Sequence, residues 1–192
     1  MGSEEYPQTV ALRDETEVTI LPLQPCDLEE LQAFYLALPE EERMVFRFDI
    51  NSPEWGAHHR RYLESGEVIS LIARRGDDLV AEATLTRSLR GWSRHVGEIR
   101  IACHESVRRQ GLGTTLAGDL VKIATELGIE KIVAHVVETQ VGARRTFEKL
   151  GFRKDAVLTK HVMDLHGAKR DLIILANDVT FIWAAMESLK QD

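Results

Sequence analysis

The stretch that decides the fold spans residues 96–113 and reads VGEIRIACHESVRRQGLG. The apolar run at residues 96–103 predicts a strand, and the two glycines at the end of the stretch predict a turn. Residues 112–127 then place leucine and isoleucine side chains on one helical stripe, which Gly128 ends. The stretch therefore reads as a strand, a glycine-rich loop and the start of a long helix.

A glycine-rich turn that leads into a helix is a favourable place for an anion. The first N–H groups of the helix point outward, the helix dipole favours negative charge, and glycine lets phosphate oxygens approach the main chain. Arg108 and Arg109 add two cationic side chains beside the glycines. We interpret residues 107–113 as a loop that binds a pyrophosphate or a related anion.

Patterns outside this stretch predict a mixed sheet with helices on both sides. Residues 129–137 are almost continuously apolar, as expected for a strand that is buried on both faces. The other predicted strands are residues 18–23, 68–74, 79–86, 153–165 and 171–175, and the other predicted helices are residues 27–38, 40–48, 53–66, 142–150 and 181–189. The chain of 192 residues fits one domain.

The charge distribution limits the classes of ligand. The net charge of −7 argues against a general nucleic-acid binder. Residues 1–66 carry a balance of −9 and residues 67–192 a balance of +2, so the N-terminal part could attract a cation. The alternative is that the acidic runs are solvated helix faces.

Several other features are plain. No apolar run is long enough to span a membrane, and residues 1–10 lack a signal-peptide pattern, so we expect no membrane association. Cys26 and Cys103 are too few for a disulfide framework and favour a reducing, cytoplasmic location. The histidines lack the spacing of a zinc site, so we expect no metal.

The loop is neither a Walker A motif, which needs Gly-Lys-Ser/Thr, nor a dinucleotide fingerprint, whose third glycine is replaced by Leu116. It resembles the acyl-CoA pyrophosphate loop of the GNAT family of N-acetyltransferases, with its Arg/Gln-x-x-Gly-x-Gly/Ala core. Residues 140–152, which read QVGARRTFEKLGF, resemble a second segment of that family. The best-matched region is residues 96–152, and the order of elements extends the resemblance to most of the chain.

The resemblance implies a fold, a domain plan and a cofactor. The expected fold is a single α/β domain with a mixed, mostly antiparallel sheet flanked by helices. Residues 18–177 would form the N-acetyltransferase domain, with an N-terminal extension at residues 1–17 and a C-terminal helical extension at residues 178–192. Acetyl-CoA would bind at Ile101, Ala102, Cys103, Arg108, Arg109, Gln110, Gly111, Leu112, Gly113, Thr114, Gln140, Ala143 and Phe147.

By the same resemblance, backbone groups of Ile101 and Cys103 would pair with the pantetheine amides, and main-chain N–H groups from Arg108 to Thr114 would cradle the pyrophosphate. The thioester would lie at a gap between the strands at residues 96–103 and 129–137. Two positions depart from the family. Gln140 replaces the usual Asn, and Phe147 replaces the Tyr that often protonates the leaving thiolate.

The amine must lose a proton before it attacks, so the predicted reaction needs a general base. Glu98 is the first candidate, and its alternative role is an ion pair with Arg100 or Arg94. His135 is the second, and its alternative role is a core histidine that bonds the backbone. Glu82 is a distant third, and Cys103 is read as a small buried side chain rather than a nucleophile.

The predicted activity is direct transfer of an acetyl group from acetyl-CoA to an amine, either a small molecule or a lysine of a protein. The acceptor, the preferred acyl chain and the oligomeric state stay open, although exposed strand edges favour a homodimer. The alternative functions are a non-catalytic acyl-CoA-binding regulatory module and a protein that binds another pyrophosphate.

Overall fold

The computed structural model describes residues 6–43, 46, 49–164, 166–179 and 181. Eight strands form one sheet in the order β1-β2-β3-β4-β5-β6-β8-β7. Every neighbouring pair is antiparallel except β5 and β6, which are parallel. The strands are β1 (Gln8–Ala11), β2 (Glu17–Pro22), β3 (Val68–Arg75), β4 (Asp78–Arg87), β5 (Val96–Cys103), β6 (Lys131–Val137), β7 (Arg153–Met163) and β8 (Lys169–Asp178). The predicted mixed, mostly antiparallel α/β fold is confirmed.

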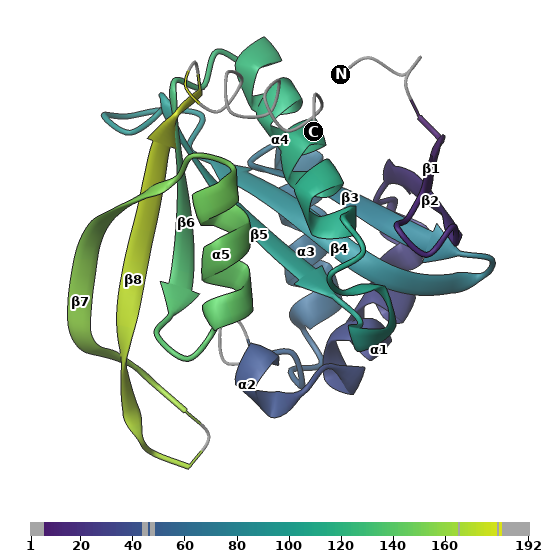
Figure 1. Ribbon diagram of the computed structural model, residues 1–192, viewed down its shortest axis with the longest axis horizontal. Coiled ribbons are helices and arrows are strands. Elements are labelled where there is room, and N and C mark those ends of the chain that lie inside the picture. The colour runs from purple at the N-terminus through teal and green to yellow at the C-terminus, as the bar shows by residue number, and fades with distance from the viewer. Residues whose placement is uncertain (1–5, 44–45, 47–48, 165, 180, 182–192) are drawn as a thin grey trace.

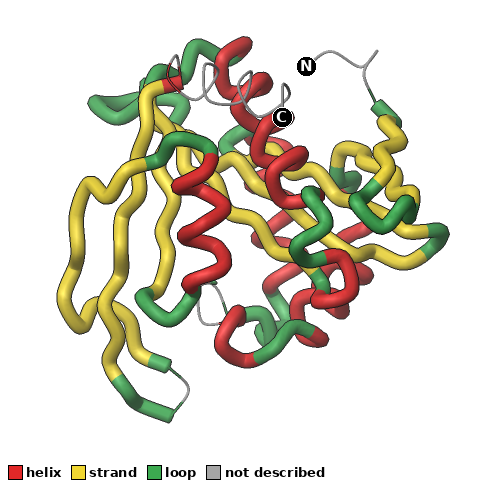
Figure 2. Tube along the Cα trace, in the orientation of Figure 1, coloured by secondary structure: helices red, strands yellow, loops and turns green. Residues whose placement is uncertain are grey.

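Helices cover both faces of the sheet (Figure 1). One face carries α1 (Leu28–Ala37) and α3 (Trp55–Ser65), and the other carries α4 (Leu112–Glu126) and α5 (Val141–Lys149). The short helix α2 (Glu40–Arg43) lies at the end of the sheet, below α5 in this view. Short 3₁₀ turns at Pro25–Asp27 and Glu105–Val107 lead into α1 and toward α4. Figure 2 shows that loops connect these elements mainly at the ends of the sheet.

Two apolar cores follow from this arrangement, because successive side chains of a strand point to opposite faces. On β3, Leu71 packs in the core that contains Leu116 and Leu120 of α4, and Ile72 packs in the core that contains Leu31 and Tyr35 of α1. The sheet therefore separates a face that carries α4 and α5 from a face that carries α1 and α3.

The parallel pair β5–β6 opens like a V. Its register joins only three residue pairs, the last of which is Glu98 with Val133. Beyond Glu98, β5 continues to Cys103 beside β4 while β6 continues beside β8, and the two strands diverge in Figure 1. At the closed end, a Cβ on Gly97 would lie 2.8 Å from Cδ1 of Leu85, so glycine permits the close packing there. The predicted gap between these strands is present in the structure.

Some elements differ from the sequence predictions. Residues 8–11, inside the expected N-terminal extension, form β1 and pair with β2. This strand is four residues long and half exposed, so its sequence carries little apolar alternation. Helix α2 covers Glu40–Arg43 of the predicted 40–48, and β8 is longer than predicted because its pairing with β6 and β7 extends it at both ends. The helix predicted at residues 181–189 lies outside the described residues apart from Phe181.

Candidate active site

The glycine loop forms the entry to α4 through two left-handed residues. Arg109 has φ 60° and Gly111, the N-cap of α4, has φ 97°. The N–H groups of Leu112 and Gly113 lie in the first turn and have no acceptor within the helix. In contrast, the N–H groups of Thr114 and Thr115 donate to the carbonyl of Gly111. The first turn of α4 therefore leaves the N–H groups of Leu112 and Gly113 without an acceptor in the helix, and the pyrophosphate role of residues 108–114 stays a prediction.

The packing around Gly113 leaves room for a larger side chain. A Cβ at this position would meet only Cγ2 of Ile101, at 4.0 Å, which is an ordinary contact. Glycine is a poor helix former and is less favourable than alanine by about 1 kcal/mol. A close approach of a ligand to the helix start would require glycine here, and this role of Gly113 stays a prediction.

The two arginines of the loop have different roles. Nε of Arg108 donates to the carbonyl of Cys103 at 3.0 Å, and its Nη2 lies 2.6 and 2.7 Å from the two carboxylate oxygens of Glu42. Arg108 thus ties the loop to α2, and its charge is balanced by that acid. Arg109 is exposed and presents its guanidinium to solvent.

The two candidate bases lie together. Nδ1 of His135 is 3.2 Å from Oε1 of Glu98, and each side chain is about a quarter exposed, at 25%. Glu98 is the last residue of β5 that pairs with β6, and its partner there is Val133. His135 lies two residues farther along β6. The pair therefore stands where the two strands separate, although the sequence offered the two residues as alternatives.

Residues 28–152 match the family described as the acetyltransferase (GNAT) family. The chain belongs to the GNAT family. The acetyltransferase resemblance stated from the sequence is thereby confirmed, and acetyl-CoA is the acetyl donor of this family.

Solved structures share the fold at low sequence identity. The GNAT domain of PAT from S. lividans has a TM-score of 0.75 at 18% identity, with 93% of this chain and 99% of that chain covered. An N-acetyltransferase from Staphylococcus aureus Mu50 has a TM-score of 0.72 at 16% identity, with 84% and 98% covered. The protein yncA from Salmonella typhimurium, solved with its cofactor acetyl-CoA, has a TM-score of 0.67 at 18% identity, with 84% and 94% covered. No curated protein sequence matches the chain.

The strand edge beside the gap fits the acyl donor of the family. From Ile99 onward, the side of β5 that faces β6 has no partner in the described ladder, so its backbone groups are open to an extended ligand. The carbonyl of Cys103 already accepts from Arg108, but a carbonyl has two lone pairs. Ala102 points to the opposite face, into the core under α1.

Cys103 is placed as a structural residue. Burial raises the pKa of its thiol to about 12, so the thiol is protonated at neutral pH. A protonated thiol is a poor nucleophile. Cys103 is half-buried and packs against the core that contains Leu116, so its protonated thiol is not suited to be an acyl acceptor.

The second family segment closes the turn after β6. Oε1 of Gln140 accepts from the N–H of Val137 at 3.1 Å and holds the start of α5 against the end of β6. Ala143 packs on the core beneath α5. Phe147 is 5% exposed and contacts Phe152 with the ring centroids 5.2 Å apart. Phe147 is therefore a core residue with no proton to donate.

Glu82 belongs to a buried polar network beneath α1. Its side chain is fully buried, accepts from Ser70 Oγ at 2.7 Å and from Thr84 Oγ1, and lies 3.5 Å from Nη2 of Arg100. The same Nη2 donates to the Tyr35 hydroxyl at 2.8 Å. With its oxygens held by these partners from β3, β4 and β5, the Glu82 carboxylate is part of a buried structural network.

Burial shifts the pKa values of two side chains in and near this network. Burial raises the pKa of Tyr35 far above its usual value, despite the opposing charge of Arg100. His59 stacks on Trp55 at 4.9 Å, and burial lowers the pKa of its imidazole. The sequence offered Arg100 as a partner of Glu98, whereas the structure pairs it with Glu82 and with the Tyr35 hydroxyl. The role of Tyr35 was not predicted, because it depends on how α1 packs against the sheet.

Arginines offset part of the negative charge that the residue count gives to the segment containing α1 and α2. Glu30 accepts from Nη1 of Arg74 at 2.8 Å, and Asp27 lies 3.2 Å from Nη2 of the same arginine. Glu42 pairs with Arg108. Glu30 and Asp27 share the single positive charge of Arg74, and Arg108 balances Glu42. These three acids therefore keep one net negative charge instead of three.

Two further observations concern the described part of the chain. None of its helices is both long and apolar enough to cross a membrane. Within the same residues, no three side chains of the His, Cys, Asp or Glu type are grouped so as to hold a metal ion.

Proposed function

We propose that this protein transfers an acetyl group from acetyl-CoA directly to an amine acceptor, either a small molecule or a lysine of a protein. The observation that carries the proposal is the Glu98–His135 pair at the point where β5 and β6 separate. An acid–base pair beside an open strand edge is what direct attack by an amine requires.

The chain supplies two binding elements for the donor. The open edge of β5 at Ile101 and Cys103 would pair with the pantetheine amides as an added strand would. The N–H groups of Gly111, Leu112 and Gly113 would hold the pyrophosphate, and Arg109 would add its positive charge. Both elements lie along β5 and α4, which orients the thioester toward the gap.

The Glu98–His135 pair would handle the proton. The donor supplies an activated thioester, whose carbon–sulfur bond breaks as the bond to the amine nitrogen forms. One member of the pair accepts a proton from the acceptor ammonium, and the other stabilises the charge that results. Because the Cys103 thiol is protonated, no side chain at this position competes as an acyl carrier.

The test needs both binding and turnover. Glu98→Gln and His135→Ala are compared with Glu64→Gln and His161→Ala, which change exposed residues of the same types. Consumption of acetyl-CoA is followed with spermidine, an aminoglycoside and a lysine-containing peptide as acceptors. We expect losses of about 10²–10⁴-fold in kcat for the site variants and wild-type rates for the controls. Unchanged turnover in both site variants would remove the base assignment.

Binding of the donor is measured separately by thermal unfolding. At about a hundredfold excess over Kd, acetyl-CoA adds about 2.7 kcal/mol of stability, which corresponds to about 5–11 °C for a chain of this size. ATP and NAD are the controls. The site variants should keep this shift, because neither residue belongs to the proposed pantetheine or pyrophosphate contacts.

A second candidate function is a regulatory module that binds acyl-CoA without turnover. The burial of Phe147 favours it, since the chain has no hydroxyl at the position where the family often has Tyr. A thermal shift with acetyl-CoA together with no turnover on any of the three acceptors would support this function over catalysis.

A further inference from the structure

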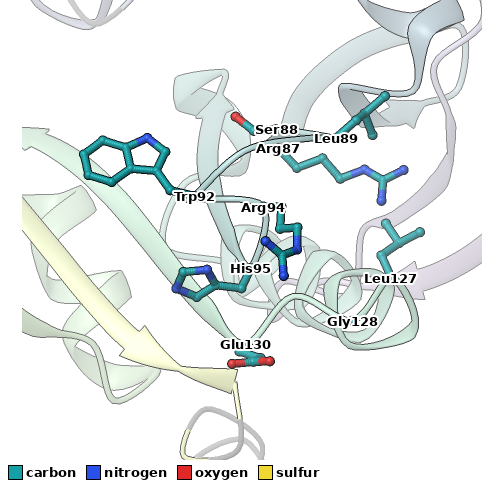
Figure 3. Close-up of a pocket in the computed structure, with 9 residues that line it drawn as sticks. All are labelled: Arg87, Ser88, Leu89, Trp92, Arg94, His95, Leu127, Gly128 and Glu130. Carbon is teal, nitrogen blue, oxygen red and sulfur yellow. The ribbon is translucent and has the colours of Figure 1, made fainter.

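A hollow lies at the opposite end of α4 from the glycine loop. It has a volume of about 650 Å³ and lies between the β4–β5 loop and the residues that follow α4 (Figure 3). Arg87, Arg94, His95 and Leu127 are among the residues that line it. Helix α4 has 15 residues and rises about 1.5 Å per residue, so about 22 Å separates its two ends. The hollow is therefore distinct from the proposed acetyl-CoA site.

The β4–β5 loop is strongly cationic within an acidic protein. Residues 87–95 contain Arg87, Arg90, Arg94 and His95 and no acid, whereas the chain as a whole carries −7. Nε of Arg87 donates to the carbonyl of Gly66 at 3.0 Å, and Nη1 of Arg94 donates to that of Gly91 at 3.3 Å. Across the described residues, none of these three arginines forms an ion pair with a carboxylate. Their remaining donors suit carboxylates or phosphates.

The same loop exposes large apolar side chains. Trp92 is 94% exposed and Leu89 is 45% exposed. Figure 3 shows Trp92 directed away from the end of α4, with Arg94 and His95 between the indole and Leu127. Tryptophan and arginine are the residue types that most often dominate the binding energy of protein interfaces. The composition of the loop is thus that of a docking surface.

The distribution of charge indicates which class of ligand suits this loop. A compact anion deep in the hollow would face the carboxylate of Glu130 and the negative end of the α4 dipole. A nucleic acid, as a continuous polyanion, would also meet the repulsion of a protein with net charge −7. A short acidic segment that crosses only the loop avoids both penalties.

We propose that residues 87–95 dock an acidic polypeptide segment that carries a bulky apolar side chain. The carboxylates of the segment bind Arg90 and Arg94, and its apolar side chain packs on Trp92 and Leu89. Arg87, held by Gly66, lines the floor of the hollow. This inference does not depend on the proposed acetyltransferase activity.

The test measures binding of a fluorescein-labelled peptide of alternating glutamate and leucine to the full chain by fluorescence anisotropy. Arg94→Glu and Trp92→Ala are compared with Arg153→Glu, which reverses an exposed charge on β7. We expect each loop variant to weaken binding at least tenfold and the control to change it less than twofold. Binding by the wild type should fall as salt rises. A cooperative thermal unfolding transition, measured without ligand, checks that each variant is folded.

Three results would overturn the proposal. The first is equal binding by the wild type and both loop variants. The second is tighter binding of a single-stranded oligonucleotide than of the acidic peptide, with loss in Arg94→Glu, which would assign the loop to nucleic acid. The third is a concentration-dependent dimer that only Arg94→Glu abolishes, which would make a second copy of this chain the occupant.

Discussion

The ion pair of Glu82 and Arg100 offers a quantitative test of how the buried carboxylate of Glu82 is stabilised. The perturbations are Arg100→Met, Glu82→Gln and the two combined. Arg100→Met leaves the fully buried Glu82 carboxylate, with 0% exposure, without its cation. Removing one partner of a buried pair costs about 3–5 kcal/mol. Because the Arg100 side chain is 26% exposed, water can reach the vacated position, and we expect a loss near about 3 kcal/mol.

Glu82→Gln should cost less. The amide can still accept from Ser70, and Arg100 keeps the Tyr35 hydroxyl and the ring of Phe46, whose centroid is 4.5 Å from its Cζ. We expect a loss of about 1.5–3 kcal/mol, the range of one hydrogen bond to a charged group. In the double variant the unpaired charge is gone, so its loss should be smaller than the sum by about 1–3 kcal/mol.

The assay is urea unfolding followed by tryptophan fluorescence, with free energies taken from midpoints at a common slope. Arg61→Met, at an exposed position of α3, is the control and should change stability by less than about 0.5 kcal/mol. If the two single losses add to within about 0.5 kcal/mol of the double loss, the pair is not coupled. The assignment of Glu82 as a structural carboxylate would then fail.

Three further predictions concern the site and its surroundings. Gly113→Ala should be as stable as wild type or more stable, since only Ile101 approaches the added Cβ. The variant should bind acetyl-CoA at least tenfold more weakly. Equal affinity in thermal-shift titrations would contradict the proposed pyrophosphate site at Gly111–Gly113. Gly97→Ala should lower the free energy of unfolding by about 1–3 kcal/mol, because the new Cβ contacts Leu85 Cδ1. Adding Leu85→Val to this variant should recover part of the loss in thermal unfolding. Additive losses from the two changes would contradict this packing. Burial lowers the pKa of His59, so its contribution to stability is full above about pH 6.5 and falls by up to about 1.4 kcal/mol per pH unit below it. His59→Phe should flatten that dependence between about pH 5 and 7, and an unchanged slope in urea unfolding would count against a neutral buried imidazole.

Local structure was predictable because it depends on neighbours in the chain. The strand at residues 96–103 is confirmed residue for residue, because its apolar run is bounded by the Gly91 loop and the glycine turn. Helix α4 ends within one residue of its prediction, where Gly128 adopts φ 70°. The left-handed Gly111 likewise follows from the conformational freedom of glycine.

Tertiary structure decided which side chains meet. Glu98 and His135 form a pair only because the parallel register joins Glu98 to Val133 and brings the next residue on that face of β6 beside it. Arg108 is committed to Glu42 rather than to the loop mouth because α2 folds against the glycine loop. Strand β1 forms because β2 supplies backbone hydrogen-bond partners for it. The local sequence pattern does not predict this pairing.

The sequence by itself therefore determined the order of elements, the glycine turn and the types of residue at the site, since periodicity and glycine conformations are local properties of the chain. Only the tertiary structure decided the charge state and partners of those residues. Burial and pairing depend on segments far apart in sequence, as the arginine-paired acids of α1 and α2 and the buried Glu82 show.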